Sequence, residues 1–128
     1  MTLPEETPVT LPPFQPARDG LYYGGAWHDA VDGGRVAVMA PADGTQLASV
    51  QVATAADVDR AVAAAREGFR VWSRTDPERR AALLLRAADL IETHAEELAL
   101  IDARDCGSPV SALMKDAGIA AGGLRYFA

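Results

Sequence analysis

The chain changes from a strand-like to a helix-like pattern at TAADVDRAVAAAREGF, residues 54–69. Before this stretch apolar residues alternate with a period of two, and within it they recur every three to four residues, as in an α-helix. Thr54 followed by Asp57 is typical of a capping box, because the threonine oxygen can accept from the amide three residues on. The stretch predicts an amphipathic helix of about four turns, with this apolar stripe: Val58, Ala61, Val62, Ala65, Phe69 and Trp72.

Three short segments before this helix predict strands. Leu21–Ala26 and Arg35–Met39 flank a cluster of turn-forming residues at 29–34, so we expect these two segments to pair as a β-hairpin. Pro41–Gly44 predicts a further turn. In Leu47–Val52 one side of the alternation is apolar, which predicts a third strand with one apolar face.

The second half of the chain predicts two more helices. Asp76-Pro77 combines an N-cap with a first-turn proline, and an apolar stripe runs from there to a stop at Gly107. Ser108-Pro109 opens a third helix, whose three glycines each disfavour it by about 1 kcal/mol relative to alanine, so tertiary contacts must support it. The chain ends inside this apolar helical stripe, which is unusual for a natural domain. Small residues on the third helix would let another backbone approach closely: Ala117, Gly118, Ala121 and Gly122.

Composition indicates a small globular protein of mixed α/β class. The chain has 128 residues, of which 49% are hydrophobic and 23% charged, enough for one domain. Residues 1–20, rich in proline, are expected to form an extended arm, and residues 21–128 the folded part. A disordered tail is the alternative for the arm.

Charge and cysteine content limit the classes of partner and the compartment. The net charge of −6 disfavours nucleic acid and anionic membranes as partners. The sequence carries no signal peptide and no apolar run of the length that a membrane helix requires. A single cysteine, Cys106, cannot form an intrachain disulfide, so a reducing, cytoplasmic setting is the simplest expectation.

The residues that could carry chemistry do not form an active site in the sequence. Cys106 is expected at the C-terminal end of a helix, where the helix dipole and nearby carboxylates oppose a thiolate, so we interpret it as inert. His28 and His94 are interpreted as solvent-exposed side chains. Neither Gly24-Gly25 nor Gly33-Gly34 stands between a strand and a helix, so neither is a dinucleotide-binding loop.

Six pieces of the sequence, in order, resemble the opening of the NAD(P)-dependent aldehyde dehydrogenase superfamily. The resemblance covers about residues 21–128, with Ala40 where the family usually has asparagine and Ser108 where it usually has lysine. The matching pieces are Tyr23–Trp27, Val38–Gly44, Leu47–Val50, Thr54–Phe69 with Val71-Trp72 and Pro77–Leu85, Asp105–Pro109, and Leu124–Ala128.

The resemblance implies a fold and a reaction. The fold is the N-terminal part of an aldehyde dehydrogenase cofactor-binding domain, in which a short β-hairpin and a third strand precede three α-helices. The complete enzyme would use NAD or NADP to oxidise an aldehyde to a carboxylic acid through a cysteine thiohemiacetal, as a homodimer or homotetramer. Its catalytic residues would lie beyond this chain, so no catalytic or cofactor-binding residue is assigned here.

The resemblance also implies one partial site, for a structural monovalent cation such as K⁺ or Na⁺. Some family members bind such a cation through backbone carbonyls before the proline turn and an acidic residue at the end of the long helix. The matching positions are Val38, Met39 and Asp105. The alternative is that Asp105 is an ordinary residue of the last helical turn.

Two hypotheses follow for the molecule as a whole. The first is an N-terminal fragment of an aldehyde dehydrogenase, inactive by itself. The second is a stand-alone helical interaction module derived from such an enzyme, which binds a partner through apolar stripes. A small independent enzyme is a third class, disfavoured because no nucleophile–base pair is identifiable.

Overall fold

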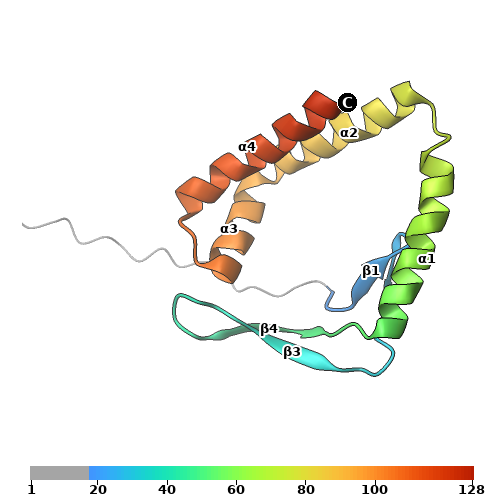
Figure 1. Cartoon of the computed structure of the whole chain (residues 1–128). Coiled ribbons are helices and arrows are strands. Elements are labelled where there is room, and N and C mark those ends of the chain that lie inside the picture. The colour runs from blue at the N-terminus through green and yellow to red at the C-terminus, as the bar shows by residue number, and fades with distance from the viewer. Residues whose placement is uncertain (1–17) are drawn as a thin grey trace, which may run out of the picture.

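The computed structural model describes residues 18–128 as two small β-hairpins followed by four helices (Figure 1). The predicted extended arm lies almost wholly outside the described residues. The elements are β1 (Leu21–Tyr23), β2 (Ala26–His28), β3 (Arg35–Met39), β4 (Gln46–Gln51), α1 (Ala55–Trp72), α2 (Pro77–Thr93), α3 (Ala95–Cys106) and α4 (Val110–Phe127).

The predicted pairing of the first two apolar segments is wrong, because each segment pairs within its own hairpin. β1 pairs antiparallel with β2, with Tyr23 opposite Ala26. The two-residue turn between them is Gly24-Gly25, whose φ angles of 60° and 81° suit a tight hairpin turn that only glycine adopts readily. β3 pairs with β4, so the predicted third strand is confirmed but its partner is β3.

The cluster at residues 29–34 connects the two hairpins, and polar side chains hold it in place. The amide of Ala30 donates to Gln51 Oε1 at 2.6 Å, and Gln51 Nε2 donates to Asp29 Oδ1 at 2.9 Å. The amide of Val31 donates to Asp57 Oδ2 at 3.2 Å. These bonds tie the connection to both β4 and the start of α1.

The predicted helix starts are confirmed. Thr54 and Asp57 form a reciprocal capping box at the start of α1, in which Asp57 Oδ2 accepts from the Thr54 amide at 2.9 Å. Asp76 caps α2 by accepting from the Glu78 amide at 2.9 Å, with Pro77 as the first helical residue.

The predicted second helix is wrong in one respect, because it divides at His94 into α2 and α3. The backbone of His94 leaves the helical region, with φ −105° and ψ 17°, although hydrogen bonds continue on both sides of it. Figure 1 shows α3 turning away from the line of α2. Both helices contact α4, so the bend lets α2 and α3 both pack on that helix. The apolar periodicity of the sequence does not predict the bend.

Helices α2 and α4 lie side by side, and the buried residues of both helices are alanines. Ala88 of α2 and Ala117 and Ala121 of α4 are buried, which confirms the predicted close approach at the two alanine positions. At Gly118 and Gly122, however, an added Cβ would meet nothing within 4 Å. These two glycines face open space, so that part of the prediction is wrong.

Large apolar side chains are mostly uncovered in the described part of the chain. The buried apolar residues there are all alanines, and the largest fully buried side chain is that of Asp57. None of the helices in the described residues is long and apolar enough to cross a membrane. The exposed large side chains lie on every helix and include Phe69, Leu90, Leu98, Ile119 and Phe127.

Candidate functional site

The structure brings together two of the three residues predicted to bind a cation. Val38 of β3 and Asp105 of α3 line one cavity of about 240 Å³ between the β3–β4 hairpin and the C-terminal half of α3. Met39, the next residue of β3, is exposed and lies outside the lining. The rest of the wall is apolar on the hairpin side and mostly charged on the helix side: Leu47, Ala48, Val50, Ile101, Asp102 and Arg104.

Two local features position the walls of this cavity. The register shifts between Val38 and Met39, where Leu47 is an extra residue on β4, and such a bulge interrupts the regular ladder of backbone bonds. Gly107 ends α3 in the left-handed conformation, at φ 75°, as the sequence predicted. A Cβ on Gly107 would lie 3.0 Å from Pro41 Cγ, so the end of α3 contacts the turn that follows β3.

The charges around the cavity would suit a hard cation held by oxygen atoms. Asp102 and Asp105 bring carboxylates to the C-terminal end of α3, where the helix dipole is also negative. Arg104 opposes them from the same wall. No group of three or more His, Cys, Asp or Glu side chains within residues 18–128 could hold a metal ion. A cation here would therefore depend on backbone carbonyls for most of its ligands.

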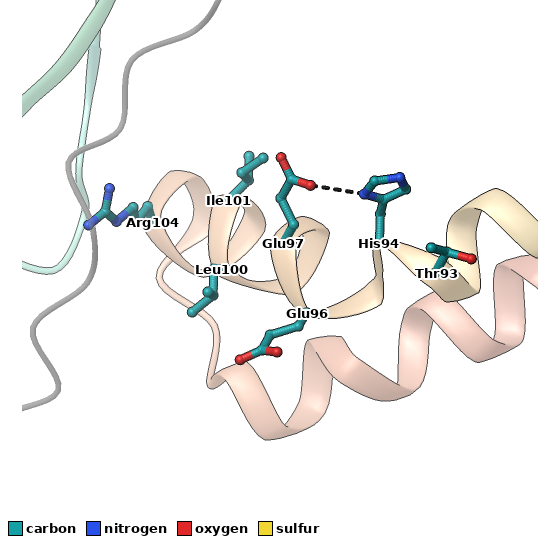
Figure 2. Close-up of a pocket in the computed structure, with 7 residues that line it drawn as sticks. All are labelled: Thr93, His94, Glu96, Glu97, Leu100, Ile101 and Arg104. Atoms are coloured by element: carbon teal, nitrogen blue, oxygen red, sulfur yellow. Dashed lines mark hydrogen bonds and ion pairs between the residues drawn. The ribbon is translucent and has the colours of Figure 1, made fainter.

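A larger cavity, of about 460 Å³, lies along α3 at the helix break (Figure 2). His94 Nδ1 donates to Glu97 Oε2 at 3.0 Å, and both side chains are exposed, as predicted for His94. The remaining lining residues are Thr93, Glu96, Leu100, Ile101 and Arg104. The His94–Glu97 pair is an ordinary surface interaction, and the lining contains no activated nucleophile. This cavity is therefore not a candidate site for covalent chemistry.

Cys106 and His28 are the other residues that the sequence analysis considered for chemistry. Cys106 is exposed at the last position of α3, the end of a helix at which the sequence predicted it, and its interpretation as inert stays a prediction. His28 is half-buried and therefore not simply exposed, contrary to the prediction. Its Nε2 donates to the carbonyl of Tyr23 at 3.2 Å, and its ring stacks on the Tyr23 ring at 4.0 Å.

Asp57 binds a second segment of the chain besides capping α1, and the sequence does not predict this second contact. Its side chain is 1% exposed, and Oδ2 accepts from the Thr54 amide, the Thr54 hydroxyl and the Val31 amide. The Thr54 amide, more than any other group, lowers the pKa of this carboxyl, and burial opposes the shift. The capping-box spacing in the sequence predicts the bonds between Asp57 and Thr54. No local pattern predicts the bond from the Val31 amide.

Comparison with known proteins decides the family. The model of the aldehyde dehydrogenase family matches residues 27–128. The chain belongs to the aldehyde dehydrogenase family. The α/β class predicted from the sequence is confirmed, and the resemblance carried by the six pieces is correct.

The related aldehyde dehydrogenases are much longer than this chain. Aldehyde dehydrogenase tropH of Talaromyces stipitatus is 36% identical over 121 aligned residues, and the match covers 92% of this chain and 24% of that protein. PnpE from Pseudomonas sp. WBC-3 is 40% identical, with a TM-score of 0.81 over 85% of this chain and 23% of its own. This aldehyde dehydrogenase chain thus spans about a quarter of the relatives it matches.

Two aldehyde dehydrogenase structures that were solved with NAD⁺ also match, with similar TM-scores. The indole-3-acetaldehyde dehydrogenase AldA of P. syringae, in complex with NAD⁺ and IAA, is 37% identical, with a TM-score of 0.80 over 85% of this chain and 23% of its own. The betaine aldehyde dehydrogenase of Staphylococcus aureus, in complex with NAD⁺, is 25% identical, with a TM-score of 0.81 over 85% of this chain and 22% of its own.

Proposed function

We propose that this chain is the N-terminal portion of an NAD(P)-dependent aldehyde dehydrogenase that oxidises an aldehyde to a carboxylic acid. The observation that carries the proposal is the family match over residues 27–128, together with a length of about a quarter of the relatives. The NAD⁺ bound in the structures of two relatives supports a nicotinamide cofactor. A cytoplasmic homodimer or homotetramer, with no nucleic acid or membrane partner, is part of the same proposal.

In the complete enzyme a cysteine thiolate would add to the aldehyde carbon to form a thiohemiacetal. NAD(P)⁺ would supply the hydride acceptor, and water would then release the thioester as the acid and restore the thiol. The described residues do not fit the cofactor, because no glycine-rich turn within residues 18–128 joins a strand to a helix. We therefore assign no step of this reaction to a residue of this chain.

The proposal predicts that the chain alone is inactive and that Cys106 is dispensable. The test is NAD(P)H formation from a panel of aldehydes by the 128-residue chain and by the full-length enzyme that contains it. The full-length enzyme, with or without Cys106→Ala, should turn over at the same rate, and the chain alone should not. Activity of the isolated chain that Cys106→Ala abolishes would overturn the proposal.

A stand-alone interaction module is the second candidate, favoured by the exposed apolar side chains on all four helices. The two candidates differ in the product that the cell makes. An intact mass near 13.5 kDa from the native host would favour the module. A product about four times as long would favour the dehydrogenase.

We further propose that the cavity between β3–β4 and α3 binds a structural K⁺ or Na⁺. The carbonyls of Val38 and Met39 and the carboxylate of Asp105 would be ligands, because Val38 and Asp105 share this cavity and oxygen donors suit a hard cation. Unfolding of the full-length enzyme should occur at a higher temperature in KCl or NaCl than in tetramethylammonium chloride. Asp105→Asn should remove this difference, and Asp116→Asn on α4 is the matched control.

A further inference from the structure

The β1–β2 hairpin carries two exposed aromatic side chains on one of its faces. Tyr22 of β1 lies opposite Trp27 of β2, and their ring centroids are 5.2 Å apart at an interplanar angle of 58°. The exposed fractions are 62% for Tyr22 and 44% for Trp27. Alternation along the strands places Leu21 and His28 on the other face, where both are half-buried. The hairpin therefore has one partly covered face and one open face, and we call Tyr22 and Trp27 the aromatic pair.

A cavity of about 300 Å³ adjoins the aromatic pair at Trp27, and Arg18 lies in its wall. Arg18 is the first residue that the structure describes. The residues just before it in the sequence therefore begin beside Trp27. Five residues in an extended, proline-rich conformation span about 15 Å, so residues 13–17 can reach both rings without a long loop.

The sequence before Arg18 has the chemistry of a segment that binds aromatic rings. It reads Pro12-Pro13-Phe14-Gln15-Pro16 and lies outside the described residues. Proline holds φ at about −65° and favours the polyproline II helix, in which about three residues make one turn. Pro13 and Pro16 would share one edge of such a helix. Polyproline II segments dock on aromatic surfaces with little loss of conformational entropy, because their backbone is already ordered.

The polar groups around the cavity already have partners, so the rings are the surface left for an occupant. Asp19 accepts a hydrogen bond from Arg35. Asp29 Oδ1 accepts from Gln51 Nε2 at 2.9 Å. A small polar ligand needs several free polar groups that fix its orientation. Proline rings need only flat apolar surfaces, which Tyr22 and Trp27 provide.

We propose that the aromatic pair docks residues 12–16 of the same chain as a polyproline II segment. The proline spacing, the position of Arg18 beside Trp27 and the open face of the hairpin all support this occupant. The docked segment covers the aromatic pair and fixes the N-terminal arm on the β1–β2 hairpin. This inference goes beyond the proposed function and does not depend on it.

The test is hydroxyl-radical footprinting of the polypeptide as the native host makes it, read by mass spectrometry at single residues. Deletion of residues 2–16 should raise the oxidation of Tyr22 and Trp27 at least about threefold, because docking removes their ring surface from water. Trp72, at the end of α1, is the internal reference and should be oxidised equally in all forms.

Two double variants separate the docked prolines from the others. Pro13→Ala/Pro16→Ala should raise the oxidation of Tyr22 and Trp27 as the deletion does. Pro4→Ala/Pro8→Ala is the matched control, since it removes as many prolines outside the docked segment, and it should change nothing. Neither variant alters a residue of the β1–β2 hairpin. Equal oxidation of Trp27 with and without residues 2–16, or equal effects of the two double variants, would overturn the proposal.

A photo-cross-link identifies the occupant. With p-benzoylphenylalanine in place of Phe14, irradiation should join residue 14 to residues 21–28 of the same chain. A cross-link that joins two chains would assign the aromatic pair to the arm of a second copy and overturn docking within one chain. Aldehyde oxidation enters none of these measurements, so failure of the proposed function would leave their result unchanged.

Discussion

Gly107 and Gly118 show how the environment of a glycine decides whether it can be replaced. Gly107 has φ 75°, and an added Cβ would lie 3.0 Å from Pro41 Cγ, whereas Gly118 is inside α4 with open space around it. We expect Gly107→Ala to lower the free energy of unfolding by about 1–2 kcal/mol, and Gly118→Ala to raise it by about 1 kcal/mol. Urea unfolding of both variants checks this, and equal effects would contradict it.

Asp57 should make stability depend on pH in the acid range. Its pKa is lower in the folded chain, because the carboxylate accepts hydrogen bonds from Thr54 and Val31. Such a group stabilises the fold fully above its unfolded pKa, and the stabilisation is lost as pH falls through the lower folded value. The melting temperature should therefore fall below about pH 3.8, the ordinary value for this carboxyl.

The Asp57→Asn variant isolates this contribution. It should melt at a lower temperature than the unmodified chain at neutral pH, and the difference should shrink in acid. Asp59→Asn, an exposed neighbour on the same helix, is the control. The pKa values of Asp19, Asp43 and Glu92 are also lowered, so part of the acid dependence remains in every form. Parallel melting curves for Asp57→Asn and the unmodified chain at all pH values would contradict the assignment.

At the scale of elements, the contact between α2 and α4 depends on the small size of alanine. Ala88 of α2 and Ala121 of α4 are fully buried, and a leucine side chain, which exceeds that of alanine by an isopropyl group, has no space in a packed interface. Ala121→Leu should lower the free energy of unfolding by about 1–3 kcal/mol. Ala120→Leu, one residue earlier and exposed, should change it by less than about 0.5 kcal/mol. Chemical denaturation measures both, and equal losses would show that this contact does not stabilise the chain.

A second interaction fixes the same pair of helices near their ends. Arg125 of α4 donates to both carboxylate oxygens of Glu92, at 2.6 and 2.8 Å, and to Asp89 at 2.8 Å. These bonds lower the pKa of Glu92 and raise that of Arg125. Arg125 and Glu92 are 33 residues apart, so their pairing cannot be inferred from helical spacing. The alanine contact and the ion pairs together define how α4 lies on α2.

Features decided by neighbouring residues could be predicted from the sequence, and features decided by distant ones could not. The caps at Thr54 and Asp76 and the stop at Gly107 are local, and each is where the sequence places it. The pairing of β3 with β4 and the bend at His94 depend on tertiary packing. The same holds for the candidate site, since only a family resemblance, and no spacing, relates Val38 to Asp105.

At the scale of the whole molecule, residues 18–128 form helices without a core of large side chains. The buried apolar residues in this range are alanines, each of which removes little apolar area from water, and burial of large side chains normally supplies most of the stabilisation. The capping interactions and the α2–α4 contact can maintain secondary structure. They give α1 little cooperative connection to the other helices.

The isolated chain should therefore behave as a partly assembled unit. We expect strong binding of a hydrophobic dye, association at micromolar concentration, and a broad thermal transition by circular dichroism, because exposed apolar faces bind dye and each other and weakly coupled elements melt separately. Val62→Glu/Phe69→Glu should reduce both dye binding and association, whereas Ala63→Glu should change neither. A monomer with a sharp transition and no dye binding would instead show that these faces are covered within the chain, and would contradict its description as a partly assembled unit.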